Sequence, residues 1–578
     1  VRALGLGPWR HPAAGTGGAP AMTVLLRSPV LLAAAAAHVA LPKIAYLSVM
    51  PLFIMLGGAT VLLGASAMSS SRIPTEYVTT FTVLVALAAM CVSLAQWADV
   101  RSSGPHVAID GAIVQDGFSV LVSVLVTIAV GLSAMVADGW LRRERMGATE
   151  MQVLMLVSGS GAIIMGEAND LIVVFLGLEI LSIALYVLAA YNARRRESGE
   201  AGLKYFVLGS FSSAVFVYGI ALVYGATGTT DLPQITDYLA RNVLLHEGLL
   251  LAGVALLLVG FFFKIAAVPF HLWTPDVYQG SPTPITGFMA AVAKAGGFAA
   301  FLRVFVSSLG LVRTDWQPAV WLIAAITLVF GATVALAQRD VKRMLAYSSI
   351  NHAGFVLLGV EAATSRGVEA ALYYLFTYTF MVIGSFAVFT VVGARGDGAH
   401  DLERYRGLSK SAPWLALSLT VFLLAQAGIP FTTGFLAKLE VVSAAVGAGS
   451  VVLAVIAMVS AVIAAFFYLR VVLLMYSPTP AMALAAAAAG TGSGRLSPPA
   501  GGATVEQALS SPLTTEDLSS TDEETLAGGP PSADDGAVDA PPPATIAVLI
   551  LCATVTVLFG LWPGPLTGFA HLARLIIP

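Results

Sequence analysis

The sequence predicts an all-α membrane protein with about 14 transmembrane helices. Of its 578 residues, 57% are hydrophobic and only 11% are charged, whereas about 25% of the residues in a soluble domain are charged. The apolar runs are roughly 20 residues long, the length that crosses a bilayer as an α-helix, and not short alternating runs typical of a transmembrane β-barrel. Single lysines stand inside several of these runs. Lysines inside apolar helices indicate an ion pathway.

Several classes of function are excluded by composition and motifs. The chain has only two cysteines, Cys91 and Cys552, in separate apolar runs, too few for an iron–sulfur cluster or a four-ligand zinc site. It carries no P-loop, no GxGxxG between a strand and a helix, and no HExxH. It also lacks a basic domain that could bind nucleic acid. We therefore expect no cofactor or metal in this chain and no nucleic-acid partner.

Residues 1–43 form an N-terminal extension in our interpretation. The chain begins with Val1, and Gly, Pro and Ala dominate up to Met22, a possible start site. The apolar run at 29–41 is too short to span a bilayer, and no clear cleavage signal follows it. We expect this extension to be poorly ordered and assign it no function.

The expected transmembrane helices fall into four regions. Helices 1–3 lie at 44–66, 76–98 and 115–136, in the region 44–136. Helices 4–8 lie at 150–168, 170–192, 203–224, 247–279 and 281–308, in the region 150–308. Helices 9–13 lie at 318–338, 342–360, 367–394, 411–442 and 447–476, in the region 318–476. The last helix is expected at 543–566.

Basic residues predict the orientation. They cluster in the loops after helices 3, 5, 9 and 11, as Arg142, Arg143 and Arg145; Arg194, Arg195 and Arg196; Arg339, Lys342 and Arg343; and Arg404, Arg406 and Lys410. By the positive-inside rule these loops face the cytoplasm, so both termini face outward. The loop 477–542 is rich in Pro, Gly, Ser and acidic residues, which predicts a disordered cytoplasmic segment. A regulatory phosphorylation loop is the alternative.

Helices 4–8 and 9–13 have the pattern of two repeats. Each group has five helices, so the second copy is inverted in the membrane, and the fourth member of each is interrupted. The first interruption is Val268-Pro269-Phe270, after Lys264; the second is the stretch 427–434, before Lys438. Matched broken helices in two halves predict a transport site.

Four buried ionisable residues are the candidate site: Glu179, Lys264, Lys294 and Lys438. A charge at the centre of a transmembrane helix costs at least about 2.5–3.5 kcal/mol, so it needs a partner or a water-filled cavity. One acidic and three basic residues leave an excess of buried cations, which favours a proton relay. The alternative is that these residues form structural ion pairs between helices. A Glu–Lys pair 4 Å apart attracts by about 4 kcal/mol at an effective dielectric of 20. Moving Glu179 relative to Lys264 could therefore switch a proton.

Three further residues are weaker candidates. His352 follows Ser348 and Ser349 and can exchange protons near neutral pH, but it could equally be a packing residue. His271 follows the first helix break and could line the same path. Lys204 opens helix 6 and could simply extend to the membrane surface.

Four segments of the chain resemble a known family. TPDVYQGSPTPITGFMAAVAKAGGFAAFLR (274–303) is joined by LKYFVLGSFSSAVFVYGIALVYG (203–225), MLAYSSINHAGFVLLG (344–359) and GIPFTTGFLAKLEVV (428–442). Together they resemble the antiporter-like subunit N family of bacterial respiratory NADH:quinone oxidoreductase (complex I), relatives of mitochondrial NADH dehydrogenase subunit 2. The segment PDVYQG followed by SPTP favours this family over subunits L and M and over multi-subunit cation/proton antiporters.

The resemblance implies fourteen helices with two inverted five-helix repeats, each holding a broken helix. It implies that Glu179 and Lys264 form the charged pair of the first half-channel, that Lys294 connects the halves, and that Lys438 lies on the exit side. His271 and Lys204 also match titratable positions. Phe431 stands where the family commonly has a second proline, which leaves the geometry of the second break open.

The implied function is proton translocation in a bacterial cell membrane, within a complex of other membrane-arm subunits. NADH, FMN, iron–sulfur clusters and a quinone would belong to the whole complex; a sequence rich in small residues favours a GC-rich bacterium and menaquinone. Two alternatives remain. A multi-subunit (Mrp-type) cation/proton antiporter would exchange sodium or potassium without NADH, and an assembly scaffold would use the lysines only to pair helices.

Overall fold

The computed structural model describes residues 45–69, 72–242, 248–393, 395–398, 400–478 and 540–573. The expected N-terminal extension lies outside the described residues, and so does the expected loop 477–542 apart from 477–478 and 540–542. The described chain is helical except for connections and one antiparallel hairpin, β1 (His106–Ala108) with β2 (Ile113–Gln115). The all-α prediction is confirmed with this small exception.

The helices follow the expected order. The first three are α3 (Tyr46–Met68), α4 (Thr75–Ser103) and α5 (Gly117–Glu144). The next group comprises α6 (Thr149–Glu167), α7 (Leu171–Ala189), α8 (Arg196–Thr227), α10 (Gly248–Ile265) with α11 (Trp273–Gly280), and the segment Thr283–Ser308, which contains α12 (Thr283–Phe288) and α13 (Lys294–Phe301). The second group comprises α14 (Arg313–Leu336), α15 (Val341–Glu361), α16 (Ser365–Val392), α18 (Pro413–Ala427) with α19 (Thr433–Gly447), and α20 (Val451–Tyr476). The last long helix is α23 (Pro543–Leu561).

Twelve helices of the described chain are long and apolar enough to cross a membrane. This confirms a polytopic membrane protein, whereas the count of fourteen crossings and the division into repeats stay predictions. Short helices that we did not predict are α9 (Leu232–Arg241), α17 (Leu408–Ser411) and α24 (Gly564–Leu572).

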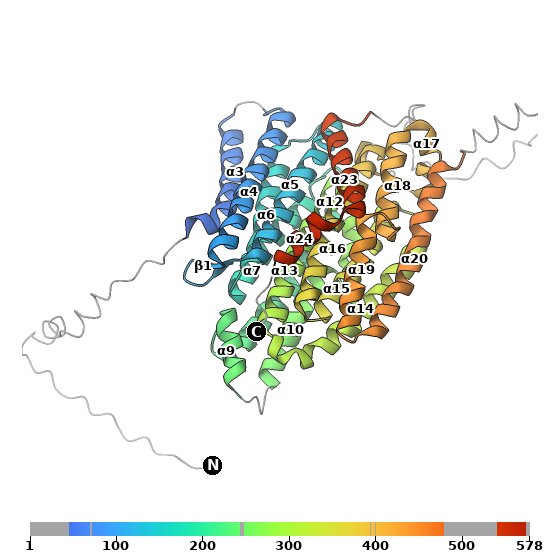
Figure 1. Cartoon of the computed structure of the whole chain (residues 1–578). Helices are drawn as coiled ribbons and strands as arrows, with labels where there is room; N and C mark the ends of the chain where they lie inside the picture. Colours follow the sequence, from blue (N-terminus) through green and yellow to red (C-terminus); the bar gives the residue numbers. More distant parts are fainter. Residues whose placement is uncertain are drawn as a thin grey trace, which may run out of the picture. The chain divides into compact units, whose positions relative to one another are not determined.

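Two helical segments form the centre of the helical body. The apolar windows of Thr283–Ser308 and Ser365–Val392 are completely buried, whereas about a third of the window is buried in α4 and α8. In Figure 1, α12, α13 and α16 lie between the blue helices α3 to α6 and the orange helices α18 to α20. The lysine at the start of α13 therefore lies at the centre of the bundle.

The basic loops contact one another at one end of the bundle. Arg143 donates hydrogen bonds to the carbonyls of Thr390 and Gly393 at 2.6 and 2.7 Å, and Arg194 donates to the carbonyl of Glu144 at 2.9 Å. We call this the basic end. Helix α9 lies at the opposite end in Figure 1. Which end faces the cytoplasm remains the prediction from charge.

The two helix groups carry matching junctions at opposite ends. Asp170 caps α7 and forms an isolated bridge with Asp231, which caps α9. Asp340 caps α15 and forms the same bridge with Asp401, just before a short 3₁₀ helix. Each junction holds two backbone hydrogen bonds. In each bond, the residue that follows one aspartate donates its N–H to the carbonyl of the residue that precedes the other aspartate. All four bonds are 2.8–2.9 Å long. Such a pair of junctions is what an inverted repeat predicts.

Both expected helix breaks are present. Between α10 and α11, Ala266 has φ +63°, the Val268–Pro269 peptide is cis, and the Val268 N–H donates to Thr327 Oγ1 at 3.0 Å. Between α18 and α19, Gly428 and Phe431 have φ +88° and +70°. Phe431 thus occupies the break where the family commonly has proline, and the helix is interrupted there nonetheless.

Candidate functional site

Glu179 and Lys264 lie close to each other without direct contact. Glu179, half-buried on α7, accepts a hydrogen bond from Ser213 of α8. Lys264, near the end of α10, is 5% exposed and donates to Ser182 Oγ at 2.8 Å. Ser182 lies one helical turn after Glu179 on α7. Among the described residues no ion pair joins the carboxylate to the ammonium, so a hydroxyl stands where we predicted a charged pair.

A small cavity lies beside Lys264. It has a volume of about 10 Å³ and is lined by Ser182, Ser213 and Lys264 among others. A single water molecule needs roughly this much space, together with two to four polar partners. Both serine hydroxyls and the ammonium supply those partners. Because Ser213 also donates to Glu179, one water in this cavity can connect Lys264 to the carboxylate through the Ser213 hydroxyl.

Lys294 is buried at the centre of the bundle. It is 5% exposed, follows a π-helical turn (Met289–Ala293), and donates to the carbonyl of Ser349 on α15 at 2.5 Å. Its ammonium also lies 5.9 Å from the ring centroid of Tyr378. One turn further, a Cβ on Gly297 would lie 3.3 Å from Lys264 Cγ. Glycine there lets α13 approach α10, which brings the first two lysines to adjacent helices.

His352 links hydroxyl groups from two other helices. Its Nδ1 lies 2.6 Å from Tyr374 Oη on α16, and its Nε2 lies 3.0 Å from Tyr468 Oη on α20. Ser348 bonds to the Tyr468 hydroxyl as well. A neutral imidazole has one donor and one acceptor nitrogen, so either tautomer connects the two tyrosines. The histidine is 1% exposed and belongs to a polar chain at the core of the bundle.

Lys438 is satisfied by the second helix break. Its ammonium donates to the carbonyl of Ala427 at 2.9 Å, an oxygen that the end of α18 leaves without a helical partner. It also lies 4.9 Å from the ring centroid of Phe355, one turn after His352 on α15. The lysine is 6% exposed. Both the break and α15 therefore position it.

Five of the predicted residues, the four main candidates and His352, lie on five different helices of the bundle. The order is Glu179, Lys264, Lys294, His352 and Lys438, on α7, α10, α13, α15 and α19. Each lysine donates to a neutral oxygen, and in the described part of the chain none of the three contacts a carboxylate. Lysines held by neutral acceptors can lose a proton without breaking an ion pair. We call these five residues the lysine line.

The remaining two candidates lie apart from the lysine line. His271 is 5% exposed and packs against the Phe330 ring at 4.8 Å, and its Nδ1 has no hydrogen-bond partner among the described residues. Lys204 forms ion pairs of 2.7 Å with Glu200 and Asp276, and its side chain is 42% exposed. Lys204 is thus a surface cross-link in this conformation.

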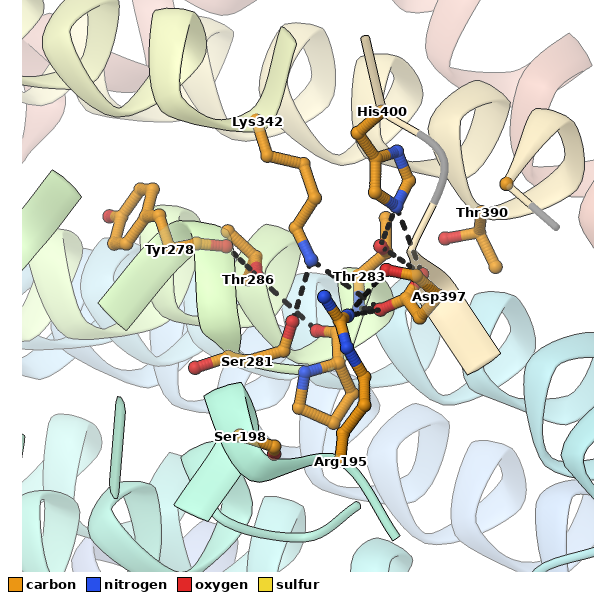
Figure 2. A network of polar contacts seen from close by, with 12 residues as sticks. Arg195, Ser198, Tyr278, Ser281, Thr283, Thr286, Lys342, Thr390, Asp397 and His400 are labelled. Carbon is orange, nitrogen blue, oxygen red and sulfur yellow. Dashed lines mark hydrogen bonds and ion pairs between the residues drawn. The ribbon is translucent and has the colours of Figure 1, made fainter. Parts of the chain in front are cut away.

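A buried ionic cluster at the basic end was missed by our sequence reasoning. Asp397 accepts from the N–H and hydroxyl of Thr283 at 2.8 and 2.6 Å, and lies 3.1 Å from His400 Nε2 and 3.4 Å from Lys342 Nζ (Figure 2). Arg195 donates to the Asp397 carbonyl. Lys342, which we expected in a loop facing water, is completely buried. The cluster joins the start of α12 to the start of α15.

The cluster fixes the charge of its carboxylate. Burial alone favours the neutral acid, but the Lys342 ammonium and the hydrogen bonds from His400 and Thr283 outweigh it, so the pKa of Asp397 lies below its ordinary value. Burial lowers the pKa of His400. Asp397 lies over a hundred residues from Thr283 in sequence, and no motif marks it, so this contact could not be predicted.

The chain resembles proteins of one family. Residues 168–464 match the family model described as NADH:quinone oxidoreductase/Mrp antiporter, transmembrane. The chain is 43% identical over 365 residues to NADH-quinone oxidoreductase subunit N of Trichlorobacter lovleyi, and the match covers 63% of this chain and 75% of that protein. It is 42% identical over 476 residues to the subunit N of Parafrankia sp., covering 78% and 90% of the two chains. The subunit N of Rhodococcus opacus is 48% identical over 353 residues, covering 61% and 65%.

Solved structures share the fold. A chain of respiratory complex I from Thermus thermophilus with bound aureothin is 30% identical, with a TM-score of 0.69 over 90% of this chain and 99% of that one. A chain of the Mrp complex from Dietzia sp. is 20% identical, with a TM-score of 0.72 over 92% and 97% of the two chains. The second likeness concerns the fold alone.

Proposed function

The chain belongs to the NADH:quinone oxidoreductase/Mrp antiporter family, and we propose that it is a proton-translocating membrane-arm subunit of a respiratory NADH:quinone oxidoreductase (complex I). The observation that carries this function is the lysine line: its three lysines, on α10, α13 and α19, are buried in the bundle and each is held by a neutral oxygen. As a translocase subunit, the chain performs no redox chemistry itself and works beside other membrane-arm subunits in the bilayer.

We assign roles along the lysine line from its contacts. Glu179, whose carboxylate accepts from a serine on the wall of the cavity beside Lys264, is the group that holds or releases the proton on Lys264. Lys294 and its tyrosine and histidine neighbours pass protons between the two helix groups. Lys438 is the last carrier before the far side.

The attraction within a Glu–Lys pair is similar in size to the cost of moving a charge across the membrane. A Glu–Lys pair at contact attracts by about 4 kcal/mol at an effective dielectric of 20. Moving one elementary charge across the membrane potential costs about 2.3 kcal/mol per 100 mV. Closing and opening the gap between Glu179 and Lys264 therefore changes the proton affinity of the lysine by enough to drive transport. The drive is electron transfer in other subunits.

We also propose the wider setting. NADH, FMN, the iron–sulfur clusters and menaquinone are bound by other subunits of the complex. The basic end faces the cytoplasm of a bacterial cell, because the arginine-bearing loops gather there. Both termini then face outward.

The Mrp-type alternative is less favoured. Relatives at 42–48% identity are all named subunit N, whereas the Mrp likeness stands at 20% identity and concerns the fold. The two functions differ in their energy source. In inverted membrane vesicles, NADH should drive proton uptake that is lost when this chain is deleted and restored when it is returned. Sodium- or potassium-dependent proton exchange without NADH, assembled around this chain, would instead identify an antiporter.

A further inference from the structure

We propose that Glu167 is a proton-release group of the first helix group, and that it discharges through the Asp116–Arg303 ion pair into a water-accessible cavity at the α9 end. This inference rests on the proposed function, because it concerns the route by which translocated protons leave the bundle. It goes beyond the lysine line, none of whose members is included in this site.

Glu167 is a buried acid, and one of its carboxylate oxygens accepts no hydrogen bond from the described residues. It is the last residue of α6 and is 3% exposed. Its Oε1 accepts a hydrogen bond from Ser123 Oγ of α5 at 3.1 Å, and its Oε2 has no hydrogen-bond partner among the described residues. A buried carboxylate without a cation is costly, and binding a proton relieves that cost. The unused oxygen is where such a proton can sit.

The neighbouring arginine is already paired with another acid. Arg303 donates to both Asp116 oxygens at 2.9 and 3.0 Å, and its Nε donates to the carbonyl of Gly166 at 2.9 Å. These bonds use three of the five N–H groups of a guanidinium. One cation therefore faces two acids, Asp116 and Glu167, and these are the charged groups that act on Glu167. The charge balances when Glu167 is neutral.

The ion pair borders a cavity of about 310 Å³, which is large enough for several water molecules. Its lining includes Asp116, Arg303, Asn169, Thr236, Asp237 and Ser308. Thr236 and Asp237 belong to α9, so the cavity lies at the end opposite the basic loops. Water in this cavity can accept a proton from the site.

Hydroxyl groups lead inward from the same site. Ser119, Ser123 and Thr127 follow one another at four-residue spacing on α5 and are at most 1% exposed. Ser119 shares a capping box with Asp116, Ser123 donates to Glu167, and Thr127 donates to the carbonyl of Ser123. The hydroxyls form a polar stripe in an otherwise apolar helix, from the ion pair into the bundle.

The proton balance of the step is simple. Neutral Glu167 gives up its proton by way of the Asp116 carboxylate, which lines the cavity and passes it to a water there; this leaves the Glu167 carboxylate and a hydronium ion. Attraction to Arg303 and the hydrogen bond from Ser123 then stabilise the carboxylate. A proton arriving from the bundle interior restores the neutral acid.

The experiment uses the complete complex in inverted vesicles, with NADH as the drive. Glu167→Gln keeps the volume and the bond from Ser123 but removes the exchangeable proton. Glu150→Gln makes the same change in the exposed first turn of the same helix and serves as the control. We expect Glu167→Gln to slow proton uptake by about a hundredfold, the lower end of the effect of losing one acid–base group, with the control unchanged. Infrared difference spectra with and without NADH should show a protonated carboxylic acid band that Glu167→Gln removes.

A second variant tests the cavity. Thr236→Cys, in a chain with Cys91→Ala, places a thiol on the cavity wall. It should react with a membrane-impermeant maleimide added to the face opposite the basic end. Lack of labelling there, or proton uptake of Glu167→Gln equal to that of the control, overturns the inference. Glu179→Gln in the same assay separates the two proposals: if it still pumps normally, the proposed function itself is wrong; if it alone fails to pump, only the release site is wrong.

Discussion

The ammonium of Lys264 donates its hydrogen bond to Ser182, at 2.8 Å. The serine lies one turn from Glu179 on α7, and it lines a water-sized cavity together with Lys264 and with Ser213, which donates to Glu179. This relationship makes the carboxylate–lysine distance adjustable. It also makes Ser182 the acceptor that holds the lysine away from the acid.

Ser182→Ala should therefore slow proton pumping. A hydrogen bond to a charged group is worth about 1.5–3 kcal/mol, and without it Lys264 is free to pair with Glu179. We expect a roughly tenfold slower NADH-driven proton uptake in assembled complex, the effect of about 1.4 kcal/mol. Ser158→Ala is the control, since Ser158 donates only to the carbonyl of Leu181. Equal rates for both variants would contradict a role for Ser182.

Asp397→Asn should destabilise the protein. The substitution leaves Lys342 as a buried cation without its anion, a change that costs about 3–5 kcal/mol. The amount of assembled complex in the membrane and its thermal unfolding in detergent measure the effect. Asp401→Asn, at an exposed position in the same loop, is the control. Normal stability of Asp397→Asn would mean that the cluster does not hold the two helix groups together.

The same carboxylate predicts a pH dependence. The folded-state pKa of Asp397 lies below its unfolded value of about 3.9. Its contribution to stability is therefore fully present above that pH and is lost as the pH falls below it toward the folded pKa. Thermal unfolding of wild type should show this extra acid sensitivity, and Asp397→Asn should lack it. Identical acid profiles of the two proteins would contradict the ionic role.

Gly434→Ala should disturb the second helix break. A Cβ there would lie 1.8 Å from the backbone carbonyl oxygen of Ala425, so the backbone must shift. Overpacking of this kind costs about 1–3 kcal/mol, and it acts beside the carbonyl that holds Lys438. Gly447→Ala, on the same helix with nothing within 4 Å, should be neutral or stabilising. Comparable assembly and pumping of both variants would show that the break tolerates movement.

Much of the architecture could be predicted because hydrophobic length and proline positions are local signals. Each expected membrane segment contains a continuous helical stretch or, at the two interruptions, a pair of helices. The hairpin β1–β2 and α9 were missed because they lie in connections too short and polar to leave a hydropathy signal. Phe431 shows the same limit: its positive φ depends on packing around the break and not on the residue type.

The candidate site was predicted only as residue types in buried helices. A charge inside an apolar run is visible in the sequence, and so Lys264, Lys294 and Lys438 could be found. The oxygen that each lysine meets depends on how helices are rotated and packed, and two of the three acceptors are backbone carbonyls, which no motif marks. Glu167 and Asp397 were overlooked because they stand at helix ends, where acids are ordinarily solvated.

The most direct test of the account is Lys294→Ala in the assembled complex, with the exposed Lys410→Ala as control. Lys294 joins the two helix groups through Ser349, so its loss should interrupt the lysine line at its centre. NADH oxidation and proton uptake into inverted vesicles would be measured together. We predict that both fall by at least about tenfold while the complex assembles normally. An assembled Lys294→Ala complex that oxidises NADH and pumps protons at the rate of the control would contradict the proton relay.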